Sequence, residues 1–329
     1  MSDLFEAYGD LEDFEDRLAS SDPGERRVAV MELGDFGEPA AIALLAKSLD
    51  DADAGVRTQA AISLGEYDGA EAAEALAKAL VDSDPDVAKA AATSAAELKD
   101  PTSADPLLPL VSNDSAYVRA SALRALKELR RADTLKVALG ALTDSDAKVR
   151  TEAVGVIGFL KLEEAIPALK SATQDADASV RRAAVSALAF SQLATAQETI
   201  IQATEDSDWQ VREIAAETLG KGQEKPEAAK ALMSVMNDEF WQVRWKATRS
   251  LGQLHVTESV DLIAPGLATD QAPNLRKEAA AALGEIASAD GTKYLQPFTD
   301  DPDPDVRKNV RWALERIGVA KDGDPAAIS

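Results

Sequence analysis

The tryptophans of this chain lie in its C-terminal half, and basic residues are interleaved with them although the net charge is −23. Large exposed aromatic side chains with arginine nearby supply much of the binding energy of protein interfaces. The chemistry that these residue types favour is therefore noncovalent recognition of a protein or peptide partner. The predicted partner-binding residues are Trp209, Gln210, Glu213, Trp241, Gln242, Trp245, Arg249, Lys277, Lys308 and Trp312, with Lys246 as a further basic neighbour.

A structural role is the alternative for two of these tryptophans. Trp209 and Trp241 stand near the start of predicted helices, where an indole ring could simply pack over the neighbouring turn. The predicted core positions of the same helices hold alanine, valine and leucine rather than tryptophan. This contrast favours a binding surface.

The chain has few candidate catalytic residues, because it has no cysteine and one histidine, His255. Neither a zinc site nor a serine-histidine-aspartate triad fits that composition, and His255 is predicted to be an ordinary loop residue. No phosphate-binding loop or dinucleotide fingerprint is present. The Asp-rich turns lack EF-hand spacing, although a site for Ca²⁺ or Mg²⁺ made of carboxylates alone is left open. We therefore predict a protein that is not an enzyme and has no cofactor.

A short motif recurs along the chain and must position these residues. Its arginine returns at intervals of 31 residues, with two intervals of 32, and alanine replaces it once. A period of this length is typical of solenoids, in which each repeat packs on its neighbours. The equivalent positions are Arg26, Arg57, Ala88, Arg119, Arg150, Arg181, Arg212, Arg244, Arg276 and Arg307.

Each repeat is predicted to contain two antiparallel helices. The aspartate four residues before the arginine is a candidate N-cap for helix B, proline often follows it, and Ser115 replaces it once. Buried positions then recur at helical spacing, as in Val56, Ala60, Ala61 and Leu64. Glycine follows eight residues after the arginine, where a helix ends or two helices cross closely. Helix A lies between copies, for example over residues 70–81. The expected N-caps are Asp22, Asp53, Asp84, Asp146, Asp177, Asp208 and Asp303.

Several repeats depart from the pattern. The third repeat has Ala88 in place of the arginine and is expected to be the loosest. Phe240 replaces an N-cap aspartate beside the two longer intervals, so the pitch is expected to change there. Prolines should shorten or kink three A helices. These prolines are Pro109, Pro265 and Pro297.

The ends of the chain read as caps, and we expect one solenoid over residues 1–318. Residues 1–20 are predicted to form an N-terminal capping helix, and residues 303–318 the last helix, closed by Trp312, Leu314 and Ile317. Residues 319–329 read as a flexible tail.

The repeated residues resemble the HEAT repeat family, in particular its short type named after phycobilisome lyases. The motif D-x-D-x-x-V-R-x-x-A-x-x-x-L-G is nearly complete at residues 51–65, 144–158 and 206–220. The resemblance implies an all-α fold: a right-handed α-solenoid of about ten 31-residue, two-helix HEAT repeats with the B helices on the concave face. It also implies that the repeating arginines bond to turn aspartates such as Asp206 or Asp208, as a structural ladder without a catalytic role.

Composition indicates the cellular environment and the class of partner. The strong negative charge repels nucleic acid and anionic membranes and suits a salt-rich cytoplasm, as in a halophilic archaeon. No segment is apolar enough to span a membrane. We expect a cytoplasmic monomer that acts as a protein-protein interaction scaffold. The alternatives are a bilin lyase-like or chromophore-binding subunit, which the family name suggests, and, less favoured, nucleic-acid binding through the aromatic and basic residues.

Overall fold

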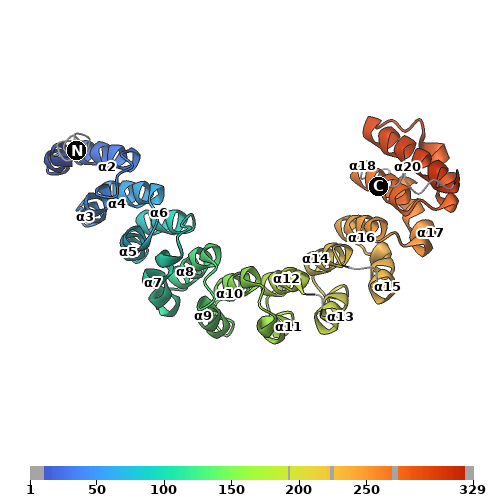
Figure 1. The fold of residues 1–329 in the computed structure, drawn as a ribbon, viewed down its shortest axis with the longest axis horizontal. Helices are drawn as coiled ribbons and strands as arrows, with labels where there is room; N and C mark the ends of the chain where they lie inside the picture. Colours follow the sequence, from blue (N-terminus) through green and yellow to red (C-terminus); the bar gives the residue numbers. More distant parts are fainter. Residues whose placement is uncertain (1–10, 192, 223–225, 269–272, 323–329) are drawn as a thin grey trace. The chain divides into compact units, whose positions relative to one another are not determined.

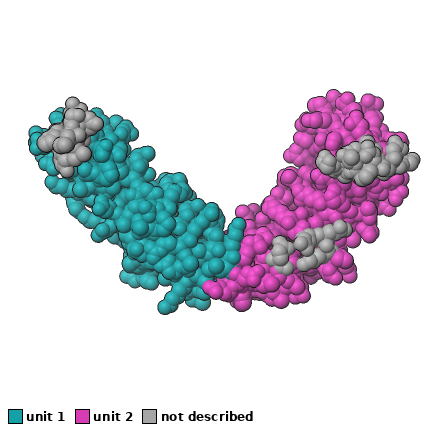
Figure 2. All heavy atoms as spheres, viewed as in Figure 1, with its two compact units in different colours: residues 1–162 teal, residues 163–329 magenta. Residues whose placement is uncertain are grey.

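The computed structural model describes residues 11–191, 193–222, 226–268 and 273–322. The chain divides into two compact units, residues 1–162 and residues 163–329 (Figure 2). Each unit is an array of helix pairs, and no strand occurs in the described ranges. The predicted all-α solenoid architecture is confirmed.

In the first unit, B helices that follow the Asp-rich turns alternate with A helices (Figure 1). Successive B helices pack against one another, so their outward side forms a continuous surface, here named the B face. The B helices are α2 (Pro23–Asp35), α4 (Ala54–Ser63), α6 (Pro85–Ala95), α8 (Ala116–Leu129) and α10 (Ala147–Leu160). The A helices are α3 (Ala41–Ser48), α5 (Ala70–Ala79), α7 (Ala104–Leu107) and α9 (Thr134–Ala141), with 3-10 turns η1 (Leu64–Glu66), η2 (Pro101–Ser103) and η3 (Leu108–Ser112).

The second unit repeats this alternation. Its B helices are α12 (Ala178–Ala187), α14 (Trp209–Gly220), α16 (Trp241–Gln253), α18 (Pro273–Ile286) and α20 (Pro304–Asp322). Its A helices are α11 (Ile166–Ala172), α13 (Ala194–Ala203), α15 (Pro226–Ser234), α17 (Val260–Ile263) and α19 (Thr292–Leu295). The 3-10 turns are η4 (Glu163–Ala165), η5 (Leu188–Phe190), η6 (Val235–Asn237), η7 (Thr257–Ser259), η8 (Ala264–Ala268), η9 (Ala289–Gly291) and η10 (Gln296–Phe298).

The aspartate N-caps of the B helices are confirmed. The Asp53 carboxylate accepts from the backbone N–H of Val56, and every other predicted cap aspartate likewise accepts from the first turn of its helix. The prediction for Ser115 is wrong, because its side chain makes no capping bond to α8. The turn is held instead by Asn113, whose side-chain oxygen accepts from the Ser115 N–H at 2.9 Å.

Prolines decide how the A helices end. Pro109 lies in η3, Pro265 in η8 and Pro297 in η10, and the α-helix before each of them is only four residues long. Proline has no N–H to continue the α-helical bonds, so the chain tightens into a 3-10 turn. The predicted shortening is confirmed. Elsewhere the A helix α5 stops at Ala79, two residues before the expected end.

Small residues let neighbouring B helices cross closely. A methyl group added to Gly284 would lie 2.8 Å from Cα of Ala313 on the next B helix, well inside van der Waals contact. A methyl group added to Gly252 would likewise lie too close to Ala282 on the next B helix, and one added to Gly34 too close to Ser63. The glycine eight residues after the arginine therefore serves mainly as a crossing point. Around these crossings the predicted stripe of alanine, valine and leucine is buried.

The repeating arginines form the predicted ladder between repeats. Nε of Arg57 lies 2.8 Å from the Asp82 carboxylate of the following repeat, and its Nη1 donates to the carbonyl of Asp51 in its own turn. Both side chains of this pair are largely buried: 15% of the Arg57 side chain and 14% of the Asp82 side chain are exposed. The aspartate also accepts the backbone N–H two residues later, so one carboxylate ties two repeats and its own turn. The described rungs are Arg26–Asp51, Arg57–Asp82, Arg119–Asp144, Arg181–Asp206, Arg212–Asp238 and Arg276–Asp301.

The ends differ from the prediction in detail. Residues 11–18 are helical, and the expected start of that helix lies outside the described residues. The last helix, α20, continues to Asp322 rather than stopping at residue 318, and the remainder of the expected tail lies outside the described residues. Of the three residues expected to close it, Ile317 is buried and Leu314 is half-buried, whereas Trp312 is exposed.

Candidate interaction surfaces

Trp209 is held by a neighbouring ring. It stacks on Phe240, with ring centroids 5.2 Å apart and ring planes at 12°. Phe240 is the residue that replaces an N-cap aspartate, and α16 begins without a side-chain cap. Arg212 lies over the other ring of the pair, with its guanidinium carbon 5.8 Å from the Phe240 centroid. Trp209 therefore packs over the neighbouring turn.

Trp241 and Trp245 lie one helical turn apart on α16 and are in tilted contact, with centroids 6.3 Å apart. The Trp245 indole N–H donates to Glu278 on α18 at 3.0 Å, which satisfies its polar group and fixes the ring. Trp241 has no such bond among the described residues, and 38% of it is exposed. Trp241 is therefore the more available ring for a partner.

Trp312 lies on α20, two B helices further along. It is 40% exposed and lies against Gly284 of α18, whose lack of a side chain makes room for the indole. The Arg316 guanidinium lies 5.5 Å from its centroid. Within the described residues no ring contact joins Trp312 to the other tryptophans. The exposed aromatic residues of the predicted patch therefore lie at two separate positions on the B face, Trp241 with Trp245 on α16 and Trp312 on α20.

Two of the predicted basic residues are engaged in ion pairs. Lys246 binds Glu217 at 2.6 Å, and Lys277 binds Asp305 at 3.1 Å. Glu217 also binds Lys221, and the hydrogen bonds from the two lysines lower its pKa to about 2. The remaining basic residues, Arg249 and Lys308, are exposed and have no ion pair in the described part of the chain.

The other predicted residues lie around the aromatic positions. Gln210 is exposed on the first turn of α14, and Glu213 and Gln242 are half-buried. His255 follows α16 with a positive φ of 51°, and its Nδ1 lies 2.7 Å from the Glu285 carbonyl oxygen. This agrees with the loop role predicted for it.

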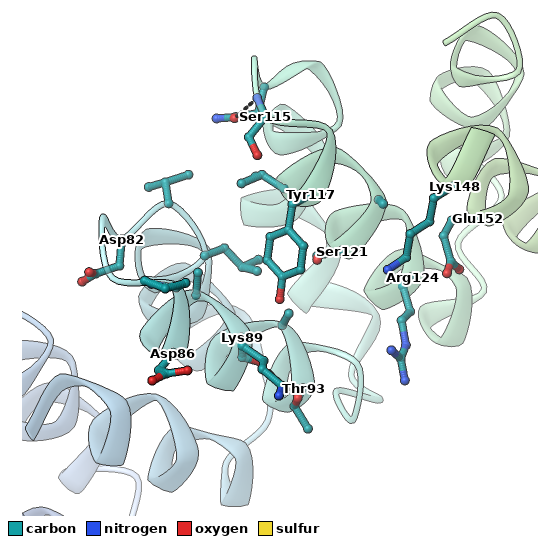
Figure 3. A pocket seen from close by; sticks show the side chains of 18 of the residues that line it. Asp82, Asp86, Lys89, Thr93, Ser115, Tyr117, Ser121, Arg124, Lys148 and Glu152 are labelled. Carbon is teal, nitrogen blue, oxygen red and sulfur yellow. Dashed lines mark hydrogen bonds between the residues drawn. The ribbon is translucent and has the colours of Figure 1, made fainter. Parts of the chain in front are cut away.

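A cavity in the first unit was missed from the sequence. Its volume is about 710 Å³, and it lies between α6 and α8 and reaches α10 (Figure 3). Tyr117 extends from α8 into this space, with Lys89 and Thr93 on the facing side of α6. Asp82 and Asp86 line one end, and Arg124, Lys148 and Glu152 line the other.

The cavity forms where the ladder is interrupted. Ala88 stands where other repeats have arginine, and Asn113 stands 25 residues later, where the partner aspartate would be. Both ends of this rung therefore depart from the repeat pattern. The signal available in the sequence was this paired replacement, which is recognisable only when the ladder partners are known.

No group of three or more histidine, cysteine, aspartate or glutamate residues within the described ranges could hold a metal ion. No described helix is both long and apolar enough to cross a membrane.

Comparisons with known proteins agree on one family. The family model for HEAT repeats matches residues 11–97, 104–189, 196–273 and 260–329. No curated protein sequence matches the chain.

Solved structures share the fold at low sequence identity. YIBA_ECOLI has 16% identity and a TM-score of 0.62, with 82% of this chain and 97% of that chain covered. Importin beta has 14% identity and a TM-score of 0.56, with 97% of this chain and 56% of that chain covered. Kap95p, solved with RanGDP, has 15% identity and a TM-score of 0.55, with 95% and 55% covered.

Proposed function

Because this chain belongs to the HEAT repeat family, we propose that it is a non-catalytic scaffold that binds a protein or peptide partner on the B face of its second unit. HEAT solenoids commonly serve as interaction scaffolds, and Kap95p binds the protein RanGDP. The observation that carries the proposal is the exposure of Trp241 and Trp312 on B helices. Burying an indole on binding gains far more free energy than burying a typical surface residue.

The charges around these rings favour a protein over a polyanion. Of the predicted basic residues, Lys246 and Lys277 are already ion-paired, which leaves Arg249 and Lys308 for a partner, and Arg316 lies over the Trp312 ring. Nucleic-acid binding depends on neutralising several phosphates with lysine and arginine. A chain of net charge −23 with so few available cations at the site is poorly suited to that.

The finer assignments rest on the sequence pattern. We assign the repeats to the short, phycobilisome-lyase-like type and the chain to the cytoplasm of a salt-adapted cell, acting as a monomer. The acidic surface keeps such a scaffold soluble at high ionic strength, where charge repulsion is screened within about 3 Å at 1 M salt.

The test is affinity capture from the host lysate at high salt, with bound proteins identified by mass spectrometry. The W241A/W312A variant removes both exposed rings. The matched control L193A/L262A removes two apolar side chains of similar exposure, beside or on A helices of the same unit.

A protein captured by the wild type and the control but lost from W241A/W312A would support the proposal. Equal capture by all three forms would refute the role of the tryptophans. Nucleic acid or a coloured tetrapyrrole in the wild-type eluate would instead favour one of the alternative functions.

A further inference from the structure

The rungs of the ladder show how this fold binds a guanidinium group. At Arg57, Nη1 donates to the carbonyl of Asp51 at 2.9 Å, while Nε and Nη2 donate to the Asp82 carboxylate. Arg119 makes the same set of bonds, to the carbonyls of Asn113 and Asp114 and to the carboxylate of Asp144. Each turn therefore offers carbonyl oxygens to a guanidinium, and the next turn offers a side-chain acceptor.

One rung of the first unit has these acceptors but no arginine of its own. Ala88 cannot reach the carbonyls of Asp82 and Ser83, which correspond to those that bind Arg57 in the preceding turn. Neither carbonyl accepts a hydrogen bond from the described residues. On the facing turn, Asn113 retains a side-chain oxygen at the position of the ladder carboxylate.

The cavity of about 710 Å³ includes this rung. Asp82, Ser83 and Asn113, the residues that carry the acceptors of the interrupted rung, belong to its lining. Val81 and Tyr117 are both substantially exposed beside it and supply apolar walls for the methylene stem of an arginine. Asp86 adds negative charge at the same end (Figure 3).

The opposite end of the cavity has different chemistry. Arg124 and Lys148 contribute two positive charges there and Glu152 contributes one negative charge, while Lys89 on α6 lies between the two ends (Figure 3). This end would repel a second cation and attract a carboxylate. The cavity is therefore polarised, with acceptors for a guanidinium at one end and cations for an acidic group at the other.

We propose that this cavity binds an arginine side chain of a partner polypeptide, which completes the interrupted rung, with a carboxylate of the same peptide directed towards α10. The site lies in the first unit and is separate from the tryptophans of the second. A guanidinium is selected over an ammonium because its planar array of donors matches carbonyl and side-chain acceptors on two sides.

The probe is N-acetyl-L-arginine, which carries both a guanidinium and a carboxylate, titrated into the full chain and followed by calorimetry. N-acetyl-L-citrulline, which is nearly isosteric but uncharged at the side chain, is the matched control. We expect the arginine compound to bind at least about tenfold more tightly than citrulline. The difference should persist in 1 M salt, where attraction to the acidic surface as a whole is screened.

Two variants locate the site. A88R/N113D supplies the missing arginine and carboxylate from the chain itself, so it should abolish probe binding and raise the thermal unfolding midpoint. N113K places an ammonium group at the acceptor end and should weaken binding at least about tenfold even if the first variant fails to fold. W241A/W312A should bind the probe like the wild type.

Two results would overturn the proposal: equal affinity for arginine and citrulline, or unchanged arginine binding in folded A88R/N113D or N113K. Unchanged probe binding by W241A/W312A keeps this test independent of the proposed scaffold function, because loss of the protein partner alone would leave the arginine site intact.

Discussion

Arg212 binds Asp238 across 26 positions of the chain, whereas Arg57 binds Asp82 across 25. The bond is not longer as a result, because Nε of Arg212 lies 2.6 Å from the Asp238 carboxylate and Nε of Arg57 lies 2.8 Å from that of Asp82. The extra residue of this repeat is therefore accommodated between the turns without loss of the rung. Connections between helices tolerate insertions more readily than the bonds that fix their ends.

This rung is expected to stabilise the array. Arg212→Ala should lower the free energy of unfolding, and a double-mutant cycle with Asp238→Asn should give a coupling of about 1.5–3 kcal/mol, because the bond joins two charged, largely buried groups. Urea denaturation measures it. The exposed pair Lys78–Asp50 is the control, with an expected coupling of about 0–1 kcal/mol. Equal couplings would show that burial does not strengthen the rung.

Glu217 should make stability depend on pH in the acid range. Its folded-state pKa of about 2 lies below the ordinary value of 4.5, so its stabilising effect is fully present above pH 4.5 and is lost as pH falls towards 2. The difference in unfolding midpoint between wild type and Glu217→Gln should therefore shrink over that interval.

Glu285 provides the opposite case for the same pH titration. Burial raises its pKa, so its contribution to stability is present at low pH and is lost as pH rises through the folded value. The unfolding midpoint of Glu285→Gln, taken relative to that of the wild type, should therefore be higher at neutral pH than in acid. Parallel trends for the two variants would contradict the assignment.

Trp209 and Phe240 should stabilise the fold together. A double-mutant cycle of Trp209→Ala and Phe240→Ala should give a coupling of about 0.5–1.5 kcal/mol, the range for paired aromatic rings. Chemical denaturation supplies the four free energies. Additive effects would mean that the stacked rings do not stabilise each other, and Trp209 would then again be a candidate for partner binding.

Gly284 should tolerate no larger residue without cost. Gly284→Ala forces apart α18 and α20 at their crossing and should destabilise by about 1–3 kcal/mol, visible as a lower thermal midpoint. Gly140, the penultimate residue of α9, has nothing within 4 Å of an added methyl group. Gly140→Ala should therefore stabilise by about 0.4–1 kcal/mol. Similar effects of both substitutions would show that the crossing has room to relax.

The sequence predicts those parts of the fold that depend on local chemistry repeated in phase. Asp53 caps a helix because a carboxylate at that position meets free amides, and Pro109 ends an α-helix because it has no N–H. Both effects act within one turn. Repetition at a constant interval located the ladder arginines, and their structural role was implied by the resemblance to the HEAT repeat family.

The candidate sites were harder to predict because they depend on pairs of distant residues. Trp209 appears exposed in its helix, and only the position of Phe240 in the next repeat shows that it is stacked. Lys246 appears available until Glu217 is found beside it. The cavity required knowledge that position 88 faces position 113 across the turns. None of these relationships follows from helical spacing alone.

The direction of each rung has a consequence for how such a chain can change length. Each rung described above runs forward, from an arginine to the aspartate in the turn of the following repeat, so cutting out one whole period rejoins a donor to an equivalent acceptor. Removing residues 88–118 would leave Arg57 with Asp82 and Arg119 with Asp144, and the interrupted rung would disappear with the deleted segment. Duplication or loss of a gene segment of that size is therefore a conservative event for the protein. The third repeat is the one whose loss would leave a more regular molecule than before.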